Sequence, residues 1–154
     1  MKHVCVVSGL FLAGLFPIAA SAADEHKAVS ADELTWKQNP ALPKGVEVAI
    51  VSGDPSKEGP YVLRLRAPAG LKVPPHFHPN DENGTVLSGT FNVGMGDEFD
   101  ESKGQTVKAG GFVIVPKEMH HYAWFEEDTV IQFHGTGPGG VTYVNPSDDP
   151  RKTQ

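Results

Sequence analysis

Turn-forming residues divide most of this chain into short pieces. The sequence holds 17 Gly and 13 Pro among 154 residues, about a fifth of the chain against a usual share of roughly an eighth. The glycines follow no Gly-X-Y period, which excludes a collagen-like fibre. After residue 40 no stretch repeats apolar residues at the helical period of about 3.6. The pattern therefore predicts an all-β fold of about ten short antiparallel strands.

The expected strands follow one another at a spacing of roughly 8–12 residues. They are residues 47–51, 61–66, 72–78, 85–87, 90–95, 105–108, 112–115, 121–125, 129–134 and 141–144. The acidic run 96–104 is expected to be a solvated hairpin connection. Residues 24–38 are polar apart from Leu34 and Trp36, and they predict a tether or a short helix that places Trp36 on the body.

The first 22 residues have the layout of a secretory signal peptide. A short basic start, Met1-Lys2-His3, precedes the apolar run 4–20, and small residues at 20–22 offer a cleavage site. A membrane anchor is the alternative, but about 17 apolar residues fall short of the ~20 that span a bilayer. We expect a signal peptide at 1–22, a tether at 23–45, a β-barrel domain at 46–145 and a tail at 146–154. The mature protein is then periplasmic or secreted, with no membrane partner.

Charge and cysteine content exclude two classes of protein. The formal net charge is −6 and the basic residues form no cluster, so nucleic acid is not an expected partner. The single cysteine, Cys5, lies inside the predicted signal peptide, which excludes an intramolecular disulfide scaffold and a Cys-rich zinc module.

Two histidines and one glutamate share a spacing that suits metal binding. His76 and His78 are two residues apart, so on a strand both imidazoles face the same side. Glu82 has the same parity, but residues 79–81 intervene and a loop is needed to bring its carboxylate back. Two imidazoles and a carboxylate bind Fe(II), Mn(II), Ni(II), Cu(II) or Zn(II). The alternative is a pair of exposed histidines on an edge strand, although the flanking prolines favour a stiff ligand-holding segment.

Two spaced motifs resemble those of the cupin superfamily over about residues 60–135. The first motif is complete, with Gly70, His76, His78, Glu82 and Gly89. The second is partial: it keeps Gly110, Pro116 and His121, but has Glu118 where the family has Gly and Phe125 where it has Asn. If the turn at Glu118 keeps the positive φ that Gly supplies, the substitution costs on the order of 1 kcal/mol.

The resemblance implies an antiparallel double-sheet, jelly-roll-like cupin β-barrel with one divalent transition metal ion inside, Fe, Mn, Ni, Cu or Zn. The ligands that it implies are His76, His78, Glu82 and His121. His120 then points to the opposite face of its strand. A homodimer through a sheet edge is compatible with the resemblance.

The resemblance does not choose a reaction, because cupins share a fold across many activities. The first hypothesis is a metalloenzyme, a dioxygenase-like oxidoreductase that acts on a small oxygenated molecule such as an organic acid or phenolic. The alternative is a non-catalytic cupin that binds metal or a small ligand as a sensor or store; a structural fold without metal is a third. The roles of His120 and His134 stay open. Arg64 and Arg66 either clamp an anionic substrate or form an exposed face with the neighbouring leucines inward.

Overall fold

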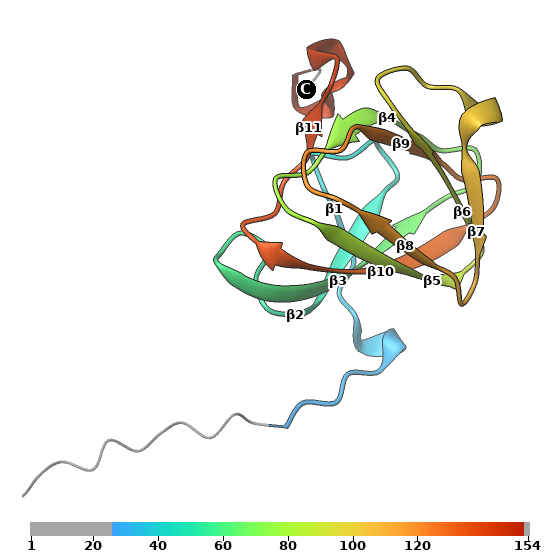
Figure 1. Cartoon of the computed structure of the whole chain (residues 1–154). Helices are drawn as coiled ribbons and strands as arrows, with labels where there is room; N and C mark the ends of the chain where they lie inside the picture. The colour runs from blue at the N-terminus through green and yellow to red at the C-terminus, as the bar shows by residue number, and fades with distance from the viewer. Residues whose placement is uncertain (1–25, 153–154) are drawn as a thin grey trace, which may run out of the picture.

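The computed structural model describes residues 26–152 and places them in two antiparallel β-sheets (Figure 1). The signal peptide predicted at 1–22 lies outside the described residues. Short 3-10 helices occur at Ala31–Glu33, Glu101–Lys103, Pro146–Asp148 and Pro150–Lys152. Among residues 26–152 no helix is long and apolar enough to cross a membrane. The prediction of an all-β, antiparallel fold is confirmed.

One sheet has six strands and the other has five. The six-stranded sheet runs in the order β1 (Lys37–Gln38), β2 (Glu47–Ser52), β3 (Gly59–Ala67), β10 (Thr129–Gly137), β5 (Glu82–Ser88) and β8 (Phe112–Val115). The five-stranded sheet runs in the order β11 (Thr142–Tyr143), β4 (Lys72–Phe77), β9 (His121–Trp124), β6 (Thr90–Met95) and β7 (Gln105–Lys108). Each of the ten predicted strands corresponds to one of these, whereas the two-residue strand β1 was not predicted.

The two sheets do not close into the barrel that was expected. Strands β1 and β8 end the six-stranded sheet, and β11 and β7 end the other. No hydrogen-bonded ladder joins these edges in the described part of the chain. The sheets instead meet through side chains, since one apolar core draws residues from both, among them Val86, Phe91, Val93, Ala123, Ile131 and Phe133. The double-sheet part of the prediction holds and the closed barrel is not confirmed.

Alternation along β3 decides which way its arginines face. Leu63 and Leu65 line the interior, and Arg64 and Arg66 point away from it. The Nε–H of Arg64 donates to Gln132 Oε1 at 3.1 Å, and the Nε–H of Arg66 donates to Glu47 Oε2 at 2.6 Å. The guanidinium of Arg66 also lies 4.6 Å from the ring centre of Trp36, which places that tryptophan on the body. The arginines form the outward face, and no anion clamp is built from them.

The acidic segment 96–104 is more than a solvated connection. Phe99 lies 4.9 Å from the ring of Tyr122 and 5.9 Å from that of Trp124, measured between ring centres. Tyr122 and Trp124 are 0 % and 7 % exposed, so this segment covers the outer face of the five-stranded sheet. The expectation of a solvated hairpin connection holds, since the segment joins the antiparallel strands β6 and β7 and most of its residues are exposed. The apolar contact that Phe99 makes with the sheet was not expected.

Candidate metal centre

Strands β4 and β9 bring three histidines together inside the molecule. His76 pairs directly with His121 across these strands, and His78 follows just after β4. All three are buried, with exposures of 5 % for His76, 8 % for His78 and 3 % for His121. One ring nitrogen from each lies within 4.8 Å of those of the other two. The structure therefore gathers residues that are far apart in sequence at a single point.

Backbone carbonyls fix the tautomer of each of these imidazoles. Nδ1 of His76 lies 2.7 Å from the carbonyl oxygen of Pro74, and Nδ1 of His78 lies 2.7 Å from that of Gly140. Nδ1 of His121 lies 3.0 Å from the carbonyl oxygen of Met119. Because a carbonyl oxygen only accepts hydrogen bonds, each Nδ1 must carry the proton. In the neutral imidazoles, each Nε2 is then left with a free lone pair, as a metal ligand requires.

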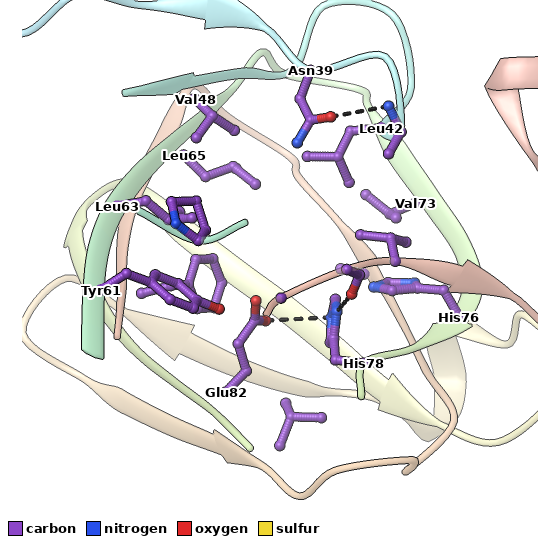
Figure 2. Close-up of a pocket in the computed structure, with 18 of the residues that line it drawn as sticks. Asn39, Leu42, Val48, Tyr61, Leu63, Leu65, Val73, His76, His78 and Glu82 are labelled. Atoms are coloured by element: carbon purple, nitrogen blue, oxygen red, sulfur yellow. Dashed lines mark hydrogen bonds and ion pairs between the residues drawn. The ribbon is translucent and has the colours of Figure 1, made fainter. Parts of the chain in front are cut away.

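Glu82 approaches the histidines from the opposite sheet. It opens β5, and its Oε2 lies 3.3 Å from Nε2 of His78 (Figure 2). It is not part of the tight three-histidine group, but it adjoins it. A carboxylate that faces an imidazole lone pair at this distance is repelled unless a proton or a cation lies between them. Three imidazoles and one carboxylate therefore fit a divalent transition metal ion.

Burial keeps the imidazoles of His76 and His121 neutral. It lowers the pKa of His76 well below 6.5, and the nearby His121 and His78 lower it further. Burial also lowers the pKa of His121 to about 4, against the opposing effect of its hydrogen bond to Met119. The pKa of the Glu82 carboxyl is raised by burial and drawn back down by His78. Neutral imidazoles are the form that binds metal, so protons compete weakly for His76 and His121 at neutral pH.

A tight turn before β9 sets the position of His121. The N–H of Met119 donates to the carbonyl of Pro116 at 3.1 Å, and Glu118 at the third position of this turn has φ 60°. The positive φ expected where cupins have Gly is thus kept by a glutamate. The N–H of Glu118 donates to the carbonyl of His78 at 2.8 Å, which ties the turn to the end of β4.

A cavity of about 370 Å³ adjoins the three histidines and Glu82. Its walls are mostly apolar and come from both sheets, including Leu63, Leu65, Val73, Phe91, Phe125 and Phe133. Leu42, from the segment predicted to be a tether, and Arg151, near the C-terminus, also line it. Sequence periodicity did not assign these two residues to the site. For Leu42, the one signal in the sequence was an apolar side chain in the segment predicted to be a tether. The space suits a small organic molecule.

The remaining histidines in the folded part of the chain lie outside this cavity. His120 points away from His121, as expected, and its ring stacks on Phe77 at 4.9 Å and bonds to Asp97 through Nδ1. His134 pairs with Asn83 between β10 and β5 and does not line the cavity. Its Nε2 is buried without a hydrogen-bond partner.

Comparison with known proteins agrees with this architecture. Residues 24–139 match the ChrR cupin-like domain. The chain belongs to the ChrR cupin-like family. A comparison of this cupin with curated protein sequences found no match.

Solved structures share the cupin fold at low sequence identity. A protein proposed to be an acetylacetone dioxygenase, from Methylibium petroleiphilum PM1, is 20 % identical with a TM-score of 0.62, covering 84 % of this chain and 88 % of that one. The polyketide cyclase RemF from Streptomyces resistomycificus is 17 % identical with a TM-score of 0.67, covering 83 % and 92 %. An RmlC-like cupin from Ralstonia eutropha JMP134 is 22 % identical with a TM-score of 0.60, covering 81 % and 76 %. These likenesses establish the fold.

Proposed function

We propose that this cupin holds one divalent transition metal ion through His76, His78, His121 and Glu82. The observation that carries the proposal is the set of three Nδ1 hydrogen bonds to backbone carbonyls, which turns three Nε2 atoms toward one point. A structural core has no need of three imidazoles held in the same tautomer beside a carboxylate. When bound, such an ion acts as a Lewis acid toward an oxygen atom of a substrate.

The site adjoins a cavity large enough for a small molecule, so we propose an enzyme that acts on a small oxygenated compound. Dioxygenase-like oxidation is the reaction class we favour. The fold shared with the proposed acetylacetone dioxygenase from Methylibium petroleiphilum supports it as an analogy. The ion is one of Fe, Mn, Ni, Cu and Zn, all of which accept this donor set.

A metal inventory tests the site. Purified protein reconstituted in turn with each of these ions is expected to retain close to one ion per chain after gel filtration, as measured by elemental analysis. His76→Ala is expected to lower the retained metal at least tenfold, since it removes a buried ligand. His120→Ala is the matched control, because this neighbouring histidine faces away from the cavity. Wild-type protein without retained metal would overturn the proposal.

A non-catalytic role is the second candidate, and the largely apolar cavity supports it, since such a pocket also suits a sensor or store of a small ligand. Oxygen uptake separates the two. Protein loaded with Fe(II) or Mn(II) is incubated with acetylacetone and with a panel of carboxylic and phenolic compounds while dissolved oxygen is recorded. Consumption of oxygen in proportion to substrate supports the enzyme, and tight binding of a compound without turnover supports the binding module.

Export to the periplasm or beyond is also a proposal, and it rests on residues 1–22 of the sequence. Mass spectrometry of protein produced in a secreting bacterial host is expected to find an N-terminus at Ala23 or Asp24. An intact Met1 in the fractionated, folded product would contradict it.

A further inference from the structure

Tyr61 brings a hydroxyl to the cavity wall that the protein itself does not use. The chain has three tyrosines. The hydroxyl of Tyr122 donates to the carbonyl of Asp100 at 2.7 Å, and that of Tyr143 donates to the carbonyl of Ala41 at 2.9 Å. The Tyr61 hydroxyl has no hydrogen-bond partner among the described residues, although Tyr61 is only 6 % exposed and lines the cavity. Among the described residues only Nε2 of His134 is a fully buried side-chain polar atom without a partner, so the unpartnered Tyr61 hydroxyl keeps accessible surface. Because Tyr61 lines the cavity, this donor is available to a bound molecule.

The strand register directs this hydroxyl toward the proposed metal ligands. Gly135 on β10 pairs with Tyr61 on β3 and with Glu82 on β5, so it stands between the two. A Cβ atom on Gly135 would lie 2.7 Å from the Tyr61 hydroxyl oxygen, which shows that the phenol lies across this glycine. Figure 2 shows the hydroxyl on the side of Glu82. The missing side chain at 135 is what lets the tyrosine reach across β10.

The other residues that line the cavity limit the kind of molecule that can bind beside this donor. Leu63, Leu65 and Phe133 lie on the same sheet as Tyr61 and offer no hydrogen bonds from their side chains. Apart from the three histidines and Glu82, two polar residues of the lining hold partners of their own, since Ser56 donates to Asp54 and Arg151 is paired with Asp149. Asn39 accepts from the N–H of Ala41 through Oδ1, which leaves its Nδ2 as a second neutral donor, at the other end of the cavity from Glu82 (Figure 2). A molecule that fills this space is therefore mainly apolar, and Tyr61 is the neutral donor that it meets beside Glu82.

We propose that Tyr61 is a ligand-positioning residue that donates a hydrogen bond to an acceptor oxygen of a compact, mainly apolar molecule in this cavity. The inference rests on the proposed function in one respect, since the hydroxyl would hold that oxygen beside the four proposed metal ligands. A hydrocarbon of the same shape would leave the donor unpaired in an apolar pocket. Tyr61 therefore selects oxygenated ligands over their hydrocarbon counterparts.

Two probe molecules of the same shape test the inference. Acetophenone carries a carbonyl oxygen where α-methylstyrene carries a CH₂ group. Dissociation constants for both are measured by NMR titration on Zn(II)-loaded wild-type protein, Tyr61→Phe and Tyr122→Phe. Tyr61→Phe is expected to weaken acetophenone binding about tenfold, the effect of one lost hydrogen bond, and to leave α-methylstyrene binding and the zinc content unchanged. Tyr122→Phe removes a hydroxyl that has its own partner outside the cavity and is expected to behave as wild type.

A second variant reaches the same hydroxyl by another route. Gly135→Ala places a methyl group against the Tyr61 hydroxyl. This variant is also expected to weaken the binding of acetophenone more than that of α-methylstyrene. Equal affinity of wild type for the two probes, or unchanged acetophenone binding in Tyr61→Phe, would overturn the role of Tyr61. Failure of the proposed metal site would give a different result. The protein would retain no zinc, but metal-free protein would still prefer acetophenone, and that preference would still depend on Tyr61.

Discussion

Two properties of single residues matter at this site: backbone strain at Glu118 and the burial of His76 and His121. Glu118 adopts φ 60°, a conformation that favours glycine, in the turn that leads into His121. The side chain is exposed, so no burial offsets the strain. His76 and His121 are buried in the neutral form, with lowered pKa values. These pKa values determine how the stability of the metal-free protein depends on pH.

Glu118→Gly is expected to raise the free energy of unfolding by about 1 kcal/mol, because glycine adopts this φ without the clash of a Cβ atom. Urea denaturation followed by fluorescence measures the difference. Lys117→Gly, one residue earlier in the same turn, is the control. It should lower stability slightly, because the glycine relieves no strain at 117 and only increases the conformational entropy of the unfolded chain. Equal effects of the two substitutions would mean that the turn relaxes around Glu118.

The metal-free protein should lose stability as the pH falls from about 6.5 to about 4. Folded His121 has a pKa of about 4 and the unfolded side chain one near 6.5, so in this window the unfolded state binds more protons. The stabilisation is complete above pH 6.5, and the loss for this residue approaches about 3 kcal/mol at pH 4. His76, whose pKa is also lowered, acts in the same direction.

Comparison of EDTA-treated wild type with His121→Gln isolates this contribution, through urea denaturation at pH 7, 5.5 and 4.5. Glu82 acts in the opposite direction, since its raised pKa makes the folded state bind protons more readily, but it is present in both proteins. The variant should show a shallower loss of stability with falling pH. His120→Gln, outside the cavity, should retain the wild-type slope, and identical slopes for all three proteins would contradict the argument.

The segment between β6 and β7 has a structural role that its acidic composition does not indicate. Phe99 packs against Tyr122 and Trp124 on the outer face of β9, whose opposite face presents His121 and Ala123 to the cavity. Lys72 on β4 adds an ion pair to Glu101 at 2.7 Å and lies over the Phe99 ring. The segment thereby braces the two strands that hold the histidines.

Phe99→Ala is expected to destabilise the protein by about 2 kcal/mol, because it exposes two large aromatic side chains to water. Chemical denaturation measures the change, and the emission of Trp124 should shift to longer wavelength in the folded variant. Phe112→Ala is the matched control: Phe112 is 52 % exposed on edge strand β8, so its loss should cost no more than about 0.5 kcal/mol. A Phe99 variant as stable as the control would show that the segment does not brace the sheet.

Prediction from the sequence succeeded where local pattern carries the information. Strands β6, β7 and β8 have the predicted bounds because turn residues flank them closely. The facing of His76 and His78 follows from strand alternation. Alternation says nothing of partners far along the chain, so the Gly140 carbonyl that fixes His78, the lining residue Leu42 and the packing of Phe99 were not predicted. Closure of the sheets was likewise not decided by any local pattern.

At the scale of the whole molecule, the proposed metal ligands come from both sheets. His76, His78 and His121 belong to or adjoin the five-stranded sheet, and Glu82 belongs to the six-stranded sheet. An ion held by all four would link the sheets at a point where no backbone ladder does. An ion that binds only the folded state stabilises it by about 2.7 kcal/mol at a concentration 100-fold above its dissociation constant.

Zinc is therefore expected to raise the melting temperature of EDTA-treated protein by about 10 °C under those conditions, measured by circular dichroism. Glu82→Gln should separate the two effects of this side chain. Without metal the variant should be at least as stable as wild type, because it no longer buries an ionisable carboxyl whose charged form burial disfavours. With zinc at the same concentration it should gain less, since the link to the six-stranded sheet is lost. Glu58→Gln, which changes an exposed carboxylate, should match wild type in both states. A zinc-induced rise as large in Glu82→Gln as in wild type would confine the ion to the three histidines, and the metal would then stabilise one sheet without joining it to the other.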